Sequence, residues 1–133
     1  MGAFLAGMFM QPRQLRGSSF AAPPRTILIC GAQDYACNAY VVTYHPAAHA
    51  YRNSQGGGAI DYERKTISIV WSNDQFKNVE TLEREVFLAA LWERGIRDTG
   101  KRDVHDWLDL SDRIIASLFH DNPDFANYVS AGY

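Results

Sequence analysis

Short runs of β-branched, aromatic and apolar residues fill the first half of the chain, and each run has the length of a strand. Residues 26–30 read Thr-Ile-Leu-Ile-Cys, and residues 38–44 hold two valines, a threonine and two tyrosines. Both runs predict strands, because such side chains pack well on a pleated sheet. Residues 59–62 and 66–71 predict a hairpin, since the second run alternates in apolar character and a Glu-Arg-Lys connection separates the two. The glycine-rich stretch at 53–58 predicts a flexible loop before it.

The second half of the chain changes to the spacing of helices. Asn78 is a candidate N-cap for the first helix, which ends before Gly95, a residue suited to the left-handed position after a helix. Apolar residues cover a wide stripe of this helix, so we expect it to be buried on more than one side. Asp103 begins a second amphipathic helix, and Asn122-Pro123 places an N-cap and a first-turn proline at the start of a short last helix.

These elements predict a single α+β domain over residues 23–133. We expect a small twisted sheet of three or four strands, packed against two main helices and a short C-terminal helix. Ala22-Pro23-Pro24 sets an extended entry and separates the domain from residues 1–22, which we interpret as a flexible N-terminal arm. The apolar run in that arm ends near Met10, too short for a membrane span, and no basic residue precedes it as in a signal sequence.

Charge and cysteine content narrow the class of protein. The 133 residues carry a net charge of −2 and no basic run longer than two residues, which disfavours nucleic acid and an anionic membrane surface as partners. We expect a soluble cytoplasmic protein. Cys30 closes an apolar run and is interpreted as a buried thiol. A disulfide with Cys37 across the intervening turn is geometrically possible, but it would need an oxidising compartment.

The central helix carries the most informative motif, Arg-Glu-Val-Phe-Leu at residues 84–88. Zincin-type metallopeptidases have His-Glu-x-x-His on such a helix, where two imidazoles one turn apart bind zinc and the glutamate acts on the metal-bound water. With the strand pattern of residues 58–69 and the helix that follows over 107–123, the motif resembles small bacterial and phage zincin-like domains without their zinc ligands. The resemblance covers roughly residues 57–128 and implies a zincin-like fold.

The resemblance assigns Glu85 to the general-base position, and Arg84 and Leu88 to the positions of the two histidines. Arginine repels a cation and leucine offers no lone pair, so we expect no zinc and no other cofactor. Glu85 would then be vestigial, because water that is not bound to a metal is a poor nucleophile at neutral pH. Arg84 could instead pair with Asp106 as a structural replacement for the metal.

Three hypotheses of function follow. The resemblance favours a catalytically inactive metallopeptidase-like module with a binding, regulatory or structural role, which would bind a polypeptide beside an edge strand near residues 66–71. Its candidate groove comprises Ile69, Arg84, Glu85, Leu88 and Asp106. An active hydrolase with an atypical site would instead use Glu85 with His105 or Asp106. A plain protein-interaction domain would have no such site, and Glu85 would point into bulk solvent.

A pair of histidines, His45 and His49, has the spacing of metal ligands on a helix. Pro46 fits only the first turn of a helix, which would make His45 a cap and not a helical residue. The sequence therefore favours a loop here, and we assign no metal site to this pair.

Overall fold

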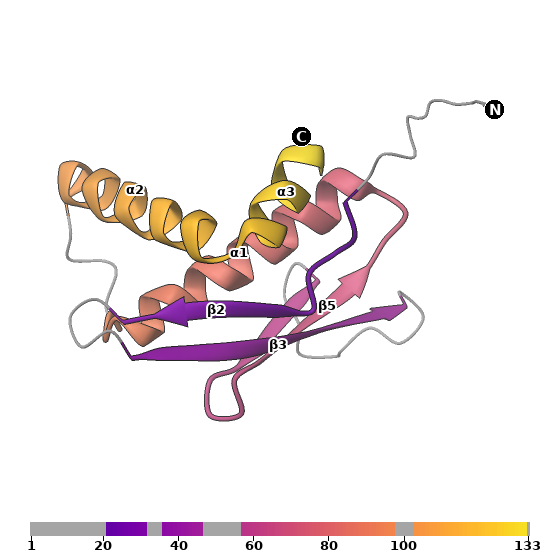
Figure 1. Ribbon diagram of the computed structural model, residues 1–133, viewed down its shortest axis with the longest axis horizontal. Helices are drawn as coiled ribbons and strands as arrows, with labels where there is room; N and C mark the ends of the chain where they lie inside the picture. The colour runs from indigo at the N-terminus through magenta and orange to yellow at the C-terminus, as the bar shows by residue number, and fades with distance from the viewer. Residues whose placement is uncertain (1–20, 32–35, 47–56, 98–102, 133) are drawn as a thin grey trace.

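Four strands and three helices make up the part of the chain that the computed structural model describes, residues 21–31, 36–46, 57–97 and 103–132 (Figure 1). The fold class is α+β, as predicted. Residues 1–20 of the predicted arm lie outside the described residues. The elements in chain order are β2 (Thr26–Cys30), β3 (Cys37–Pro46), β4 (Gly58–Asp61), β5 (Thr66–Trp71), α1 (Gln75–Glu93), α2 (Val104–Asp121) and α3 (Pro123–Gly132).

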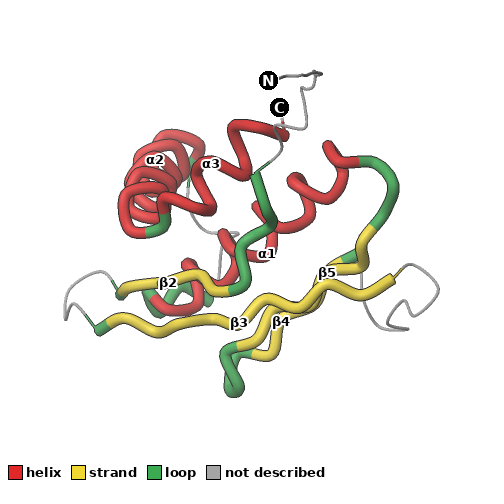
Figure 2. Tube along the Cα trace, turned by 45° about the vertical axis from the view of Figure 1, so that its right-hand side comes forward, coloured by secondary structure: helices red, strands yellow, loops and turns green. Residues whose placement is uncertain are grey.

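The strands form one mixed sheet in the order β2-β3-β5-β4. β3 and β5 are parallel, whereas the two outer pairs are antiparallel. All three helices lie on the same side of the sheet, with α1 running along it (Figures 1 and 2). The core lies between the two layers and includes Ile27, Ile29, Tyr40, Val42, Ile67 and Ile69 from the sheet, and Val79, Leu82, Val86, Ile114, Leu118 and Phe125 from the helices.

The strand that we predicted near the edge, residues 66–71, lies inside the sheet. The predicted hairpin is confirmed, but its second strand, β5, pairs with β4 on one side and with β3 on the other. The β3–β5 pairing is a parallel contact between distant segments, and such a contact leaves no local signal in the sequence. The edge strand of this hairpin is therefore β4.

Helix α1 begins one turn earlier than predicted, because its N-cap is Asp74 and not Asn78. The Asp74 carboxylate accepts a hydrogen bond from the backbone N–H of Lys77 at 3.3 Å. Asn78 is buried, and its side chain accepts from the N–H and donates to the carbonyl of Ser72, both at 2.9 Å. Asparagine makes such local backbone bonds at caps and at turns, so its presence alone did not fix its role. The predicted end is confirmed, with Gly95 at a φ of 77°.

Cys30 and Cys37 form a disulfide, so the interpretation of Cys30 as a thiol is wrong. The two residues are directly opposite each other in the antiparallel β2–β3 pair, with Cα atoms 3.9 Å apart. Their pairing depends on the register of the two strands, which the sequence left open. Disulfides persist in oxidising compartments. The cytoplasmic location therefore stays a prediction, and this bond disfavours it.

The β2 edge of the sheet is closed by one side chain, Asn122, at the junction of α2 and α3. Asn122 Oδ1 accepts from the backbone N–H of Leu28 at 2.7 Å, and Nδ2 donates to the Leu28 carbonyl at 2.8 Å. Nδ2 also donates to the Leu118 carbonyl at 2.9 Å. The predicted helix start at Asn122-Pro123 is confirmed, and the asparagine also takes the place of a neighbouring strand beside β2.

Replacing Asn122 by alanine should lower the free energy of unfolding by about 2 kcal/mol, because backbone groups of Leu28 and Leu118 would lose their partners. Urea unfolding followed by circular dichroism measures the change. Asn127→Ala is the matched control, since Asn127 is exposed on α3, and it should change the stability by less than about 0.5 kcal/mol. Equal stability of the two variants would contradict the edge-closing role.

Candidate functional site

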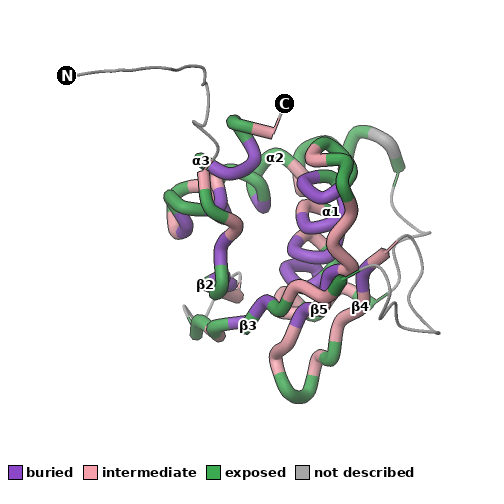
Figure 3. The backbone as a smooth tube through the Cα atoms, turned by 90° about the vertical axis from the view of Figure 1, so that its right-hand side faces the viewer, coloured by how far each residue is buried: buried purple, intermediate pink, exposed green. Residues whose placement is uncertain are grey.

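Glu85 lies in the middle of α1 on the side that faces the sheet. The helix is buried along much of its length (Figure 3), and its buried polar positions recur at helical spacing as Asn78, Thr81 and Glu85. Glu85 is only 5% exposed, and glutamate is almost never buried to this extent unless it is paired. The hypothesis of a plain interaction domain expects Glu85 to point into bulk solvent, and the buried side chain does not do so.

Gly58, the first residue of β4, makes room for the Glu85 side chain. A Cβ atom at position 58 would lie 2.6 Å from Cγ and 2.8 Å from Oε2 of Glu85. These distances are well inside van der Waals contact. The carboxyl group therefore lies directly against the β4 backbone, and any residue larger than glycine would have to displace it.

The Glu85 carboxylate accepts one hydrogen bond within the described residues, from Nε of Arg84 at 3.2 Å. An ionised carboxylate has about four acceptor positions, so the described residues leave most of its capacity unfilled. Burial raises the pKa of Glu85, and the hydrogen bond and charge of Arg84 offset only part of the rise. Buried acids with a raised pKa are concentrated at functional sites.

Strand β4 and the middle of α1 run side by side in the same direction. A Cβ atom on Gly57, just before β4, would lie 3.8 Å from the Thr81 methyl group, and just beyond β4 the ring of Tyr62 stacks on that of Trp92 with centroids 4.3 Å apart. The two spans match, because the extended chain from 57 to 62 and the helix from 81 to 92 each cover about 16 Å. We call the residues along this contact the β4–α1 surface: Gly58, Ile60, Tyr62, Glu85 and Leu88.

Two residues of β4 direct their backbone N–H and C=O groups away from the sheet. The N–H of Val70 donates to the carbonyl of Gly57 at 2.7 Å, so these two residues form a hydrogen-bonded pair at the start of the hairpin. Bonded and non-bonded pairs alternate along an antiparallel ladder, which turns the backbone groups of Gly58 and Ile60 outward. No strand in the described part of the chain pairs with this side of β4.

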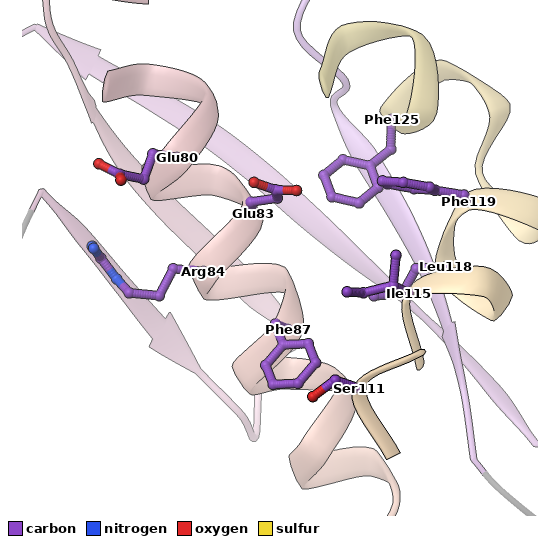
Figure 4. Close-up of a pocket in the computed structure, with 9 residues that line it drawn as sticks. All are labelled: Glu80, Glu83, Arg84, Phe87, Ser111, Ile115, Leu118, Phe119 and Phe125. Atoms are coloured by element: carbon purple, nitrogen blue, oxygen red, sulfur yellow. The ribbon is translucent and has the colours of Figure 1, made fainter. Parts of the chain in front are cut away.

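A second surface lies on the side of α1 that faces α2 and α3, where the helices leave a hollow of about 450 Å³ (Figure 4). In Figure 4, Phe87 of α1 approaches Ser111 of α2, whereas the Arg84 side chain extends away from α2 and α3. Arg84 lines the hollow as well as pairing with Glu85, whereas Glu85 does not line it. The lining residues are Glu80, Glu83, Arg84, Phe87, Ser111, Ile115, Leu118, Phe119 and Phe125.

The groove predicted from the sequence is only partly assembled. Arg84 and Glu85 are in contact, and Leu88 is 39% exposed one turn along the same helix. Ile69 is fully buried in the core beneath α1, so its side chain lines no groove. The sheet packing explains the difference, since the inward positions of an interior strand are covered by the helix.

Asp106 and His105 do not join Glu85. Both are exposed in the first turn of α2, where the Asp103 carboxylate accepts the backbone N–H of Asp106 at 2.9 Å. The predicted N-cap at Asp103 is thereby confirmed. Arg84 pairs with Glu85, and the described part of α2 supplies neither an ion pair for Arg84 through Asp106 nor an acid–base partner for Glu85.

The side chains at the two zinc-ligand positions do not fit a metal ion. Arg84 is permanently charged and Leu88 has no lone pair. Within the described ranges, no group of three His, Cys, Asp or Glu side chains is placed to hold a metal. His45 lies in β3, where its ring nitrogen is 3.1 Å from the Thr43 hydroxyl, and His49 lies outside the described residues.

Sequence reasoning missed the β4 side of this site, namely Gly58, Ile60 and Tyr62. These residues meet α1 only after the hairpin folds back beneath the helix. One signal was present, because a glycine within a strand is unfavourable and marks close approach of another group. Gly58 was assigned to the preceding loop in the sequence, where that signal is lost.

No protein-family model, no curated protein and no solved structure matches this chain. In the ranges that the structure describes, no helix has both the length and the apolar character needed to cross a membrane. Function therefore has to be inferred from the geometry of the β4–α1 surface.

Glu85→Gln should stabilise the protein at pH 7 by about 1 kcal/mol, the scale of a typical stabilising substitution. The pKa of Glu85 is higher in the folded than in the unfolded state. The protonated carboxyl group therefore contributes its full stability below the unfolded-state pKa, and this stability is lost as the pH rises through the folded-state pKa. Glutamine does not ionise and avoids this loss.

Thermal unfolding of both proteins between pH 4 and pH 8 measures the effect, and the difference should shrink as the pH falls. Glu80→Gln is the control, since Glu80 is exposed on the same helix. A Glu85→Gln variant that is less stable than wild type at pH 7 would show that the Arg84 pair outweighs burial.

Proposed function

We propose that this chain is a metallopeptidase-like module without catalytic activity, and that it binds an extended polypeptide along β4. The observation that carries the proposal is the burial of Glu85 of α1 against Gly58 of β4. β4 is an edge strand, and the backbone groups of Gly58 and Ile60 point outward from it. In the zincin-like domains that the sequence resembles, the edge strand next to the catalytic helix pairs with an extended substrate. Here an edge strand, β4, lies beside α1, and the side chains of Arg84 and Leu88 do not fit zinc, which supports the proposal.

Hydrolysis is disfavoured by what surrounds Glu85. A general base needs a nucleophile of suitable acidity within hydrogen-bond reach, and a zincin supplies it as metal-bound water. Arg84 and Leu88 do not supply metal ligands, and His105 and Asp106 are exposed in the first turn of α2, whereas Glu85 is buried. Without a second group, Glu85 would contribute little to the cleavage of a peptide bond.

Binding is favoured by the backbone of β4. Ile60, which is half-buried, offers one outward donor and one outward acceptor, and the backbone groups of the buried Gly58 point the same way. An added strand would satisfy these groups by pairing in the manner of β-augmentation. Leu88, which is 39% exposed, and the half-buried Tyr62 lie beside this edge and can contact side chains of the added strand. The main chain would thus give affinity, and α1 would give selectivity.

Amide exchange should detect the added strand directly. In the free protein we expect the N–H group of Ile60, which is half-buried and turned outward, to exchange faster, relative to its intrinsic rate, than those of Ala59 and Asp61, which face β5. Acetylated heptapeptides that alternate threonine and valine around one variable residue should slow exchange at Gly58 and Ile60 by about tenfold or more at saturation. Proton-resolved hydrogen exchange by NMR makes the measurement.

Ile60→Pro separates main-chain pairing from side-chain contact. Proline removes the outward N–H of residue 60 and leaves the bonds to β5, because proline is tolerated on the open side of an edge strand. Ile60→Ala, the matched control, keeps the N–H and loses the side chain. Peptide binding should be lost in the proline variant and retained in the alanine variant, and equal binding by both would rule out strand addition at β4.

The protein should not retain zinc. After purification without chelators, zinc loading and desalting, elemental analysis should give far less than one zinc per chain, because the ligand positions hold Arg84 and Leu88. The double variant Arg84→His with Leu88→His restores the two imidazoles and should gain zinc affinity. Stoichiometric zinc in the wild type would overturn the inactive-module proposal and direct attention to His45, His49 and His105.

A further inference from the structure

Oε2 of Glu85, the oxygen that lies against Gly58, also accepts the Arg84 hydrogen bond, and Oε1 accepts none from the described residues. The Glu85 side chain is 6% exposed, and its hydrogen bond comes from Arg84, whose own side chain is 43% exposed. The carboxyl group lies against the Gly58 backbone, at the point where an added strand would begin to pair. A strand added to β4 would remove the remaining solvent exposure of the Glu85 carboxylate.

The register of the sheet fixes which ligand side chain would meet Glu85. Residues directly opposite each other in a ladder place their side chains on the same face. Ile69 is opposite Gly58, and its side chain is buried beneath α1. A ligand residue opposite Gly58 on the other edge would therefore direct its side chain to the α1 face as well, next to Glu85.

The chemistry of that ligand residue follows from the cost of covering a carboxylate. An apolar side chain would remove water from Glu85 without giving it a donor, and an acidic one would be repelled. A cationic nitrogen donor would fill the open acceptor positions with charge-assisted hydrogen bonds. The exposed side of Leu88, one turn along α1, is placed to contact the aliphatic stem of a long basic side chain.

We infer that the polypeptide bound along β4 places the cationic nitrogen of a lysine or arginine side chain, at the position opposite Gly58, on the Glu85 carboxylate. This inference rests on the proposed function, because it requires strand addition at β4. It goes further by assigning the ligand a class, a basic segment, and by giving Glu85 the role of the selecting residue.

The test uses the heptapeptides described above, with lysine, arginine, norleucine or glutamate at the central position, acetylated or with a free N-terminus. Dissociation constants come from NMR titration of the Gly58 and Ile60 amides. We expect the acetylated lysine and arginine peptides to bind at least about tenfold more tightly than norleucine, the usual order for a close charge pair at an interface. Tighter binding of the norleucine peptide only when its N-terminus is free would show that the terminal amine meets Glu85, and would overturn the assignment to a lysine or arginine side chain.

Two variants complete the test. Glu85→Gln keeps the shape of the side chain and should bring the preference for the cationic peptide close to one, whereas Glu80→Gln should leave it unchanged. Peptides that protect Gly58 and Ile60 equally, whatever their charge, would overturn the role of Glu85 and leave the proposed function standing. A set of peptides that protects neither amide would overturn both proposals.

Discussion

Helix α1 is held on the sheet in one rotational position by polar anchors near both of its ends. At the start, the buried side chain of Asn78 bonds to both backbone groups of Ser72. At the end, the Glu93 carboxylate accepts three hydrogen bonds from the sheet. The donors to Glu93 are Asn38 Nδ2 at 2.7 Å, Tyr40 Oη at 2.6 Å and Lys65 Nζ at 2.6 Å. Because a helix is rigid over four turns, these anchors fix which residues between them face the sheet, and Glu85 is one of them.

Two glutamates on this helix, the buried Glu85 and the partly buried Glu93, therefore have opposite effects on stability at neutral pH. Burial alone would raise the pKa of Glu93, but the bonds from Lys65, Tyr40 and Asn38 outweigh it and lower the pKa, so the charged form stabilises the fold at neutral pH. Glu85 has one such bond, burial raises its pKa, and its charged form is costly. When environments separate the pKa values of two like groups, the groups have different roles. Glu93 has a structural role, and Glu85 has the character of a site residue.

Local elements could be predicted from the sequence, and contacts across the sheet could not. The strands, the hairpin and the ends of the helices at Gly95 and Asn122 follow from periodicity and from capping residues, which act within a few positions. The interior place of β5 and the pairing of Cys30 with Cys37 depend on register and strand order, for which a single sequence holds little information.

The candidate site shows the same limit. The motif around Glu85 could be recognised because it lies on one helix turn. Its partners on β4 are brought to it by the hairpin, and Asp106 was placed in the groove by analogy with a longer-range arrangement that this chain does not adopt. Gly58 illustrates this limit. Its role is to lack a side chain at the place that Glu85 occupies, and this role can be recognised only once the two residues are known to be in contact.

The two edges of the sheet differ, and the difference bears on the proposed function. Sheets protect their edges because an open one pairs with other chains, and at the β2 edge Asn122 fills that place with a buried amide. At β4, in the part of the chain that the structure describes, Gly58 and Ile60 face outward beside a charge that is costly to keep. Strand addition needs only this backbone and the helix next to it, whereas peptide hydrolysis also needs an activated water. Under the proposed function, β4 and α1 would hold a polypeptide without a metal, and the unfavourable charge of Glu85 would be retained because the ligand neutralises it.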